Sequence, residues 1–150
     1  MTCILYVDAD GEMGQLLRRT FEETGAIRVY LAGSGEEALT SSTRTLADVI
    51  VSDFCLPGMD GVMLLKTLRS QGIGVPFIFF TSDFTIPLKE VACLPNVFRF
   101  NGRNGFEKKE ILRLLRVVYW VAGNHETDVI PVITEDVQRA NGRPAGADLT

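Results

Sequence analysis

Residues 51–61 have the sequence VSDFCLPGMDG, in which the end of an apolar run meets a turn-rich segment. Its first residues close an apolar run, 49–52, that ends in a single carboxylate, Asp53. The residues that follow include Pro57 and Gly61, which favour a tight turn. The pattern predicts a buried strand that presents Asp53 at its end. The simple structural alternative is that Asp53 only caps the next helix, because Asp is favoured at helix N-termini.

Length and composition are those of an ordinary globular chain. Its 150 residues are enough for one domain with a hydrophobic core, and 46% of them are hydrophobic. The net charge of -4 argues against direct nucleic-acid binding. No apolar run is long enough to span a membrane, and the N-terminus MTCILYVDAD lacks the basic region of a signal peptide. The scattered cysteines form no CxxC, so we expect a cytoplasmic protein without a disulfide framework or zinc site.

Five short apolar runs recur along the chain, at residues 3–7, 27–31, 49–52, 77–80 and 97–100. Most are nearly continuous rather than alternating, as in parallel strands that are covered on both faces. Helical patterns follow them, at residues 13–24, from 34 onward, 62–72, 83–92 and 106–122. This alternation predicts an α/β fold. We expect a flavodoxin-like, doubly wound (βα)5 domain, with a five-stranded parallel sheet of order 2-1-3-4-5 and helices on both faces.

The composition changes after residue 122. Residues 123–150 contain five acids, two prolines and three glycines, with one short apolar piece at 129–133. Such a segment has too little apolar surface to form a core of its own. We predict that residues 1–122 form the folded domain and that residues 123–150 are a partly ordered C-terminal extension or linker.

Polar residues follow several of the predicted strands, where a doubly wound sheet binds its ligands. The residues expected at this rim are Asp8, Asp10, Asp53, Thr81, Ser82 and Asn101. Neighbouring carboxylates repel one another, so a cation such as Mg²⁺ would stabilise them. Such a site suits phosphoryl transfer to an aspartate, with the hydroxyl of Thr81 binding a phosphoryl oxygen. The alternative is that each acid is only a helix N-cap.

Three pieces of the sequence occur in the order and spacing of a known family: ILYVDAD at 4–10, VIVSDFCLPGMDG at 49–61 and PFIFFTS at 76–82. Over about residues 3–122 the chain resembles the CheY-like receiver domain of two-component response regulators. The resemblance implies that Asp53 is the phosphoacceptor. It also implies that a histidine kinase or a phosphotransfer protein is the partner that supplies the phosphoryl group.

The same resemblance implies roles for the surrounding residues. A Mg²⁺ ion would be held by Asp8, Asp53 and the backbone carbonyl of Cys55. The switch and phosphoryl-binding residues would be Thr81, Ser82 and the mobile aromatic Phe98. Phosphorylation would change the face formed by the fourth helix, the fifth strand and the fifth helix. The domain would not be an enzyme, apart from self-catalysed phosphorylation and dephosphorylation.

Two positions depart from the family pattern. Ala9 replaces the second of two consecutive acids, so Asp10, one position later, is the remaining candidate metal ligand. Asn101 occupies the position of the usual lysine and carries no charge. These departures leave a second interpretation open, in which the chain is a pseudo-receiver that acts as a phosphorylation-independent protein-binding module.

The piece VDADG, residues 7–11, supports a third interpretation. A DxDG motif after the first strand resembles the opening motif of haloacid-dehalogenase-like phosphatases, with Asp8 as nucleophile and Asp10 as acid/base. Against this, Glu12 lies where those enzymes place Thr or Val. The phosphatase interpretation also leaves Asp53 and the loop after it unexplained.

The predicted fifth helix is apolar on more than one side, because Leu112, Tyr119 and Trp120 lie off its main core stripe. A helix of this kind is usually covered on more than one side. The cover would be the tail at 129–133, a second protomer in a homodimer, or a missing output domain.

Overall fold

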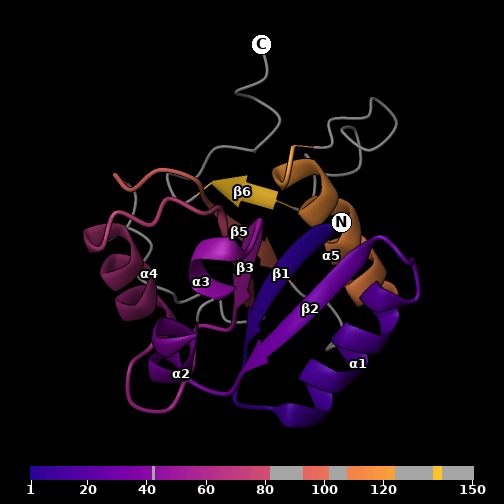
Figure 1. The fold of residues 1–150 in the computed structure, drawn as a ribbon, viewed down its shortest axis with the longest axis horizontal. Helices are drawn as coiled ribbons and strands as arrows, with labels where there is room; N and C mark the ends of the chain where they lie inside the picture. The colour runs from indigo at the N-terminus through magenta and orange to yellow at the C-terminus, as the bar shows by residue number, and fades with distance from the viewer. Residues whose placement is uncertain (42, 82–92, 102–107, 124–136, 140–150) are drawn as a thin grey trace.

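The computed structural model describes residues 1–41, 43–81, 93–101, 108–123 and 137–139 (Figure 1). The strands are β1 (Thr2–Val7), β2 (Ile27–Ala32), β3 (Val49–Ser52), β4 (Phe77–Thr81), β5 (Val97–Asn101) and β6 (Val137–Arg139). The helices are α1 (Gly11–Glu22), α2 (Gly35–Thr40), α3 (Thr43–Leu46), α4 (Gly61–Ser70) and α5 (Lys108–Val121). The predicted helix at 83–92 lies outside the described residues.

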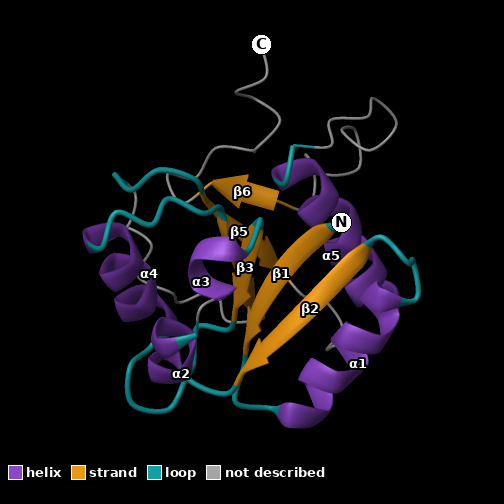
Figure 2. Ribbon diagram, viewed as in Figure 1, coloured by secondary structure: helices purple, strands orange, loops and turns teal. Residues whose placement is uncertain are grey.

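The first five strands are parallel and lie in the order β2-β1-β3-β4-β5. The predicted fold class is therefore confirmed. Figure 2 shows helices on both faces of this sheet, with α1 and α5 on one side and α2, α3 and α4 on the other. Each face has its own hydrophobic cluster: Leu17 of α1 and Leu114 of α5 belong to one, and Leu65 of α4 belongs to the other.

The central strands are almost entirely apolar, and both of their faces are covered. All four residues of β3 are fully buried, at 0% exposure. Successive side chains point to opposite faces, so Val51 joins the α1–α5 cluster and Ile50 joins the α4 cluster. A strand that is buried on both sides has no polar alternation, and this is why the continuous runs predicted it correctly.

β6 was not predicted. Val137, Gln138 and Arg139 pair antiparallel with Phe100, Arg99 and Phe98 of β5. These three residues lie within the predicted C-terminal extension and have no strand pattern of their own. The outer edge of β5 offers unpaired backbone groups, and this edge, rather than the local sequence, accounts for the strand. The extension therefore contributes an edge strand to the sheet of the domain.

The predicted second helix begins as its sequence indicates. The side chain of Ser34 caps α2 by accepting the Glu37 N–H at 3.1 Å. The Glu37 carboxylate accepts the N–H of Gly33 at 2.8 Å. The pattern then divides into two short helices, α2 and α3. None of the helices in the described ranges is both long and apolar enough to cross a membrane.

Candidate functional site

The parallel pairing brings the predicted site residues to one edge of the sheet. Val7 at the end of β1 pairs with Ser52 at the end of β3. Asp8 and Asp53 are the next residues, and the Asp53 N–H donates to the Val7 carbonyl at 2.9 Å. The structure therefore places these two aspartates on adjacent strand ends, as the order of the sheet predicts.

The Asp8 carboxylate accepts two hydrogen bonds, one from β1 and one from its own loop. The Tyr6 hydroxyl donates to Oδ2 at 2.7 Å, and the Asp10 N–H donates to Oδ1 at 2.9 Å. The Asp8 N–H itself donates to the carbonyl of Ala32 at 3.0 Å, which ties the loop to the end of β2. These hydrogen bonds orient the Asp8 carboxylate. Neither of them involves the side chain of Ala9, the residue that replaces the second acid of the family pattern.

Tyr6 is a site residue that sequence analysis missed. Its side chain is only 1% exposed. Burial raises the pKa of its phenol strongly, and the negative charge and hydrogen bond of Asp8 raise the pKa further, followed by the charges of Asp53 and Asp10. The negative charges of all three acids therefore act on the phenol of Tyr6. The sequence contained one indication of the contact between Tyr6 and Asp8. The two residues are two positions apart, and residues at this spacing along a strand face the same side.

Asp10 has a structural role. It is the N-cap of α1, and its Oδ1 accepts the N–H groups of Glu12 at 3.1 Å and Met13 at 3.2 Å. A cap of this kind satisfies helix donors that would otherwise have no partner. The capping role that the simple alternative assigns to this acid is therefore observed, and its predicted part in metal binding stays a prediction.

Asp53 is placed differently from Asp10. The N-cap of α4 is Asp60, whose Oδ1 accepts the Met63 N–H at 2.8 Å. Asp53 lies at the opposite end of the loop, and its Oδ1 accepts the N–H of the next residue, Phe54, at 2.7 Å. The structure therefore does not support the alternative that Asp53 only caps the next helix.

The loop between Asp53 and α4 is closed by backbone packing at Gly61. The Gly61 N–H donates to the Phe54 carbonyl at 2.8 Å. A Cβ at position 61 would lie 2.7 Å from the Asp53 carbonyl oxygen and 3.1 Å from the Phe54 Cα. Only glycine fits this approach, because both neighbouring atoms belong to the backbone. Gly58 has a φ of 74°, a left-handed conformation that also favours glycine.

The donor set at this rim suits a hard cation. Mg²⁺ in proteins takes oxygen ligands, usually one or two carboxylates with several waters. The family resemblance assigns Asp8, Asp53 and the backbone carbonyl of Cys55 to such a set, and the side chain of Ala9 adds no oxygen to it. Three side chains of His, Cys, Asp or Glu do not converge as a metal site anywhere among the described residues. Any ion at this rim would therefore depend on main-chain and water oxygens as well as on carboxylates.

The remaining predicted residues lie on the next two strands. Thr81 and Asn101 are the last residues of β4 and β5, and they are direct partners in the register of the two strands. Their backbones therefore lie side by side at the same sheet edge as Asp53. Ser82 lies outside the described residues.

Phe98 on β5 points into the hydrophobic core. It is 5% exposed and belongs to the cluster between the sheet and α5. Its ring meets the Trp120 ring edge-to-face, with the centroids 6.4 Å apart and the planes at 84°. Edge-to-face pairs of this kind stabilise beyond their buried area. The aromatic side chain is thus held in an inward position in this structure.

Comparison with known proteins shows the family. The sequence model of the response regulator receiver domain matches residues 4–100, and the chain belongs to this family. Membership stands against the haloacid-dehalogenase-like interpretation, in which Asp8 and Asp10 would be the catalytic pair.

Two curated relatives are transcriptional regulators. The chain is 30% identical over 99 residues to the C4-dicarboxylate transport transcriptional regulatory protein DctD of Pseudomonas aeruginosa, covering 66% of this chain and 21% of that protein. It is 37% identical over 79 residues to the alkaline phosphatase synthesis transcriptional regulatory protein PhoP of Bacillus subtilis, covering 53% of this chain and 32% of that protein. The match thus spans a third or less of the length of these two relatives.

Solved structures agree with the fold. The receiver domain of the Francisella response regulator 1452 is similar, with a TM-score of 0.59, 30% identity and coverage of 80% of this chain and 98% of that one. The chemotaxis response regulator CheY4 of Vibrio cholerae has a TM-score of 0.64 and 25% identity, with coverage of 79% of this chain and 98% of that one.

Proposed function

We propose that this receiver domain accepts a phosphoryl group on Asp53 from a histidine kinase or a phosphotransfer protein. One observation supports this above the others. β3 places Asp53 beside Asp8 at the sheet edge, and the capping role that would otherwise explain an aspartate in this loop belongs to Asp60. The proposal places the chain in the cytoplasm, where a reducing environment suits its scattered cysteines.

The proposed chemistry is a transfer between two side chains. A carboxylate oxygen of Asp53 attacks the phosphorus of a phosphohistidine, the new O–P bond forms, and the N–P bond to the imidazole breaks. Mg²⁺ held by Asp8, Asp53 and the Cys55 carbonyl would neutralise charge on the phosphoryl oxygens. The product is an aspartyl phosphate on the chain itself, so the domain has no other substrate to turn over.

The two neighbouring strands supply the remaining groups in this proposal. The Thr81 hydroxyl would donate to a phosphoryl oxygen, and Ser82, the next residue in the sequence, is the second hydroxyl of the proposal. Asn101, at the position of the usual lysine, donates a neutral hydrogen bond. Complete loss of a preorganised donor costs roughly 3 kcal/mol of transition-state stabilisation, and replacing a charged donor by a neutral one costs part of this. We therefore expect phosphorylation to be slow compared with that of a receiver that has a lysine at this position.

The signal would leave through β5 and α5. Phosphorylation adds charge at the rim, beside the ends of β3, β4 and β5. Phe98 lies on β5 and contacts Trp120 on α5, so movement of β5 would be transmitted to α5. In this proposal, the output face consists of β5, α5 and the helix predicted at residues 83–92, which is not the α4 of the structure.

A second candidate function is that of a pseudo-receiver, which binds a partner without phosphorylation. The inward packing of Phe98 against Trp120 favours this candidate, because the aromatic residue already occupies a buried position. Ala9 and Asn101 favour it as well, since both lack the charge that the family pattern has there. In this case the face of β5 and α5 would be a constant binding surface.

The predicted homodimer through α5 now has less support. Trp120 is 3% exposed and lies in the core of its own chain, and Tyr119 packs against the same cluster. Leu112 remains exposed, at 44%. The predicted cover by residues 129–133 lies outside the described residues. A dimer through α5 would therefore depend on Leu112. Leu112→Glu should dissociate such a dimer, and light scattering would then give the molar mass of a monomer.

Acetyl phosphate with Mg²⁺, followed by intact mass measurement, tests the function. We expect a phosphate adduct on the wild type and on Asp60→Asn, a matched change in the same loop that preserves a helix cap, and none on Asp53→Asn. Ala9→Asp combined with Asn101→Lys should form the adduct faster. An adduct on this double variant but none on the wild type would identify a pseudo-receiver. An adduct on Asp53→Asn would contradict Asp53 as the acceptor.

A further inference from the structure

The two lateral edges of the sheet, which are the outer sides of β2 and of β5, differ in what covers them. β6 pairs with β5 at one edge. β2 is the outermost strand at the other, and no further strand lies beside it in the part of the chain that the structure describes. An edge strand presents backbone N–H and C=O groups that can pair with another chain. The edge of β2 is therefore a place where a partner could add a strand.

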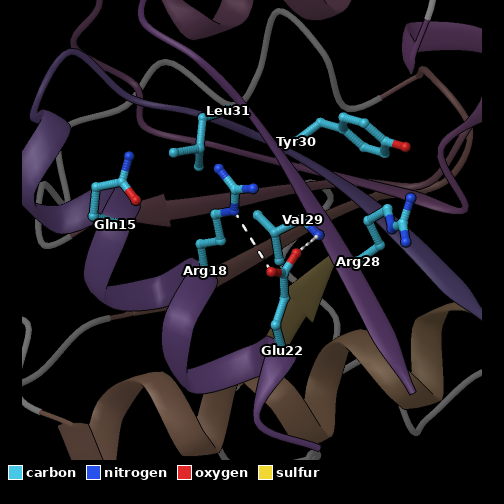
Figure 3. A pocket seen from close by; sticks show the side chains of 7 residues that line it. All are labelled: Gln15, Arg18, Glu22, Arg28, Val29, Tyr30 and Leu31. Atoms are coloured by element: carbon cyan, nitrogen blue, oxygen red, sulfur yellow. Dashed lines mark hydrogen bonds and ion pairs between the residues drawn. The ribbon is translucent and has the colours of Figure 1, made fainter. Parts of the chain in front are cut away.

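A groove of about 480 Å³ follows this edge, between β2 and α1 (Figure 3). One wall is formed by Gln15, Arg18 and Glu22 of α1, and the other by residues 28–31 of β2. The side chains of Arg28 and Tyr30 are exposed, whereas Val29, on the opposite face of the strand, is buried. The groove therefore extends around the edge of the strand and reaches both faces of the sheet.

The groove already binds a carboxylate, and that carboxylate belongs to the chain itself. Glu22 Oε2 accepts the Val29 backbone N–H at 2.9 Å. Glu22 Oε1 lies 3.6 Å from Nε of Arg18 (Figure 3). The side chains of Arg18 and Glu22 are 48% and 34% exposed, and ion pairs of this exposure contribute little to stability. The ion pair with Arg18 thus holds Glu22 only weakly, and another carboxylate or carbonyl group could take over the hydrogen bond from the Val29 N–H.

The direction of the Val29 N–H identifies further donors and acceptors. In a parallel ladder, the backbone groups of alternate residues point toward the same side of the strand. Since the Val29 N–H points away from β1 and toward Glu22, the backbone groups of Ile27 and Leu31 also point away from β1. This is the spacing that an added strand requires.

The charge of the groove selects the partner. Three arginines, Arg18, Arg19 and Arg28, line it and the adjoining hollow on α1, against the single acid Glu22, a surplus of two positive charges. The whole chain has a net charge of -4, so this surplus is a local reversal of sign. A second copy of the chain would bring the same arginines against these ones, and like charges repel. The charge instead favours an acidic partner.

We propose that the groove between α1 and β2 binds an extended acidic peptide segment of a partner protein, which adds to the edge of β2 as a further strand. The peptide backbone replaces Glu22 at the Val29 N–H, and peptide carboxylates pair with Arg18 and Arg28. Recognition of this type derives affinity from main-chain hydrogen bonds and specificity from alternate side chains. The site is remote in sequence from Asp53 and does not depend on its phosphorylation.

Fluorescence anisotropy with a short labelled peptide of alternating Glu and Val residues tests the proposal on the full chain. Glu22→Ala removes the internal competitor and should tighten binding about tenfold, whereas Arg28→Glu should weaken it about tenfold or more. Lys66→Glu, the same charge change at an exposed residue of α4 on the other face of the sheet, should leave binding unchanged. Asp53→Asn should bind as the wild type does, which separates this test from that of the phosphoacceptor.

Two control peptides make the test specific. A Lys–Val peptide should not bind, and a Glu–Val peptide with alternate backbone nitrogens methylated should lose binding because it cannot form a ladder. Equal binding of either control, or unchanged binding by Arg28→Glu, would overturn the proposal. Thermal melting of each variant verifies its fold. A concentration-dependent dimer that Arg28→Glu dissociates would assign this edge to a second copy and also overturn it.

Discussion

The β1–α1 loop, residues 8–10, and the β3–α4 loop, residues 53–60, present carboxylates at the same edge of the sheet, but different forces hold them. In the first loop, Asp8 accepts hydrogen bonds from Tyr6 and Asp10, and Asp10 caps α1. In the second, Gly61 packs directly against the backbone of the loop. Carboxylates accept hydrogen bonds in both loops, but only the second loop adds steric closure at a glycine to the hydrogen bonds of Asp53 and Asp60.

This difference bears on the proposed chemistry. A phosphoacceptor needs a fixed position, and the close backbone contact between Gly61 and Asp53 contributes a restraint that involves no charged group. The carboxylate of Asp8 is oriented by hydrogen bonds that a metal ion or a change of protonation would alter. We therefore expect the β1–α1 loop to be the responsive part of the rim, and the β3–α4 loop to be its fixed part.

Gly61→Ala should have the largest effect. The added Cβ would lie 2.7 Å from the Asp53 carbonyl oxygen, and both backbones would have to shift. We expect a loss of about 2–3 kcal/mol in the free energy of unfolding, as for other overpacked sites, measured by urea denaturation. Gly11→Ala is the matched control, because Gly11 is also the first residue of its helix and nothing lies within 4 Å of its added Cβ. Equal losses in both variants would show that steric closure does not hold the β3–α4 loop.

Tyr6→Phe should have an intermediate effect, of about 1.5–2 kcal/mol, because it removes a hydrogen bond to a carboxylate. The effect should also depend on pH. The folded protein raises the pKa of Tyr6, whereas a tyrosine in the unfolded chain titrates near pH 10. The contribution is thus fully present below about pH 10 and is lost progressively as the pH rises above it.

Urea denaturation between neutral and alkaline pH measures this dependence. The wild type should lose stability above about pH 10 more steeply than Tyr6→Phe does. Tyr30→Phe, at a tyrosine that is 37% exposed, serves as the control and should keep the wild-type slope. Parallel slopes for wild type and Tyr6→Phe would contradict the raised pKa of the buried Tyr6 phenol.

Asp10→Ala should have the smallest effect, about 1 kcal/mol, which is typical of a lost N-cap. Asp60→Ala, the cap of α4, should cost a similar amount, so the pair compares the same contact in the two loops. Asp10→Asn keeps a capping oxygen and should restore the stability. It also tests the predicted metal role, because unchanged Mg²⁺ affinity in Asp10→Asn would limit Asp10 to capping.

Much of the fold was predictable because its determinants are local. The apolar runs at 27–31 and 49–52 became β2 and β3 with at most one residue of difference. The capping pattern at Ser34 was also confirmed. β6 was not predictable, since Val137–Arg139 has no strand pattern and its pairing depends on the edge of β5.

The candidate site was predictable in part. The positions of Asp8 and Asp53 on adjacent strand ends follow from the order of the sheet. The distinction between a capping aspartate and a phosphoacceptor candidate does not, because Asp10, Asp53 and Asp60 are the same residue type in similar loops. It required the hydrogen bonds that each carboxylate makes.

The sequence alone specified the five strands β1–β5, their parallel direction and the residues that follow their carboxyl ends, because burial on both faces leaves a continuous apolar pattern in the chain. The tertiary structure alone decided three further features: the burial of Tyr6 among the acids, the inward packing of Phe98 on Trp120, and the hold of Glu22 on the edge of β2. Each of these contacts depends on the distance and direction between side chains and backbone in three dimensions, and no local pattern of hydrophobicity specifies them.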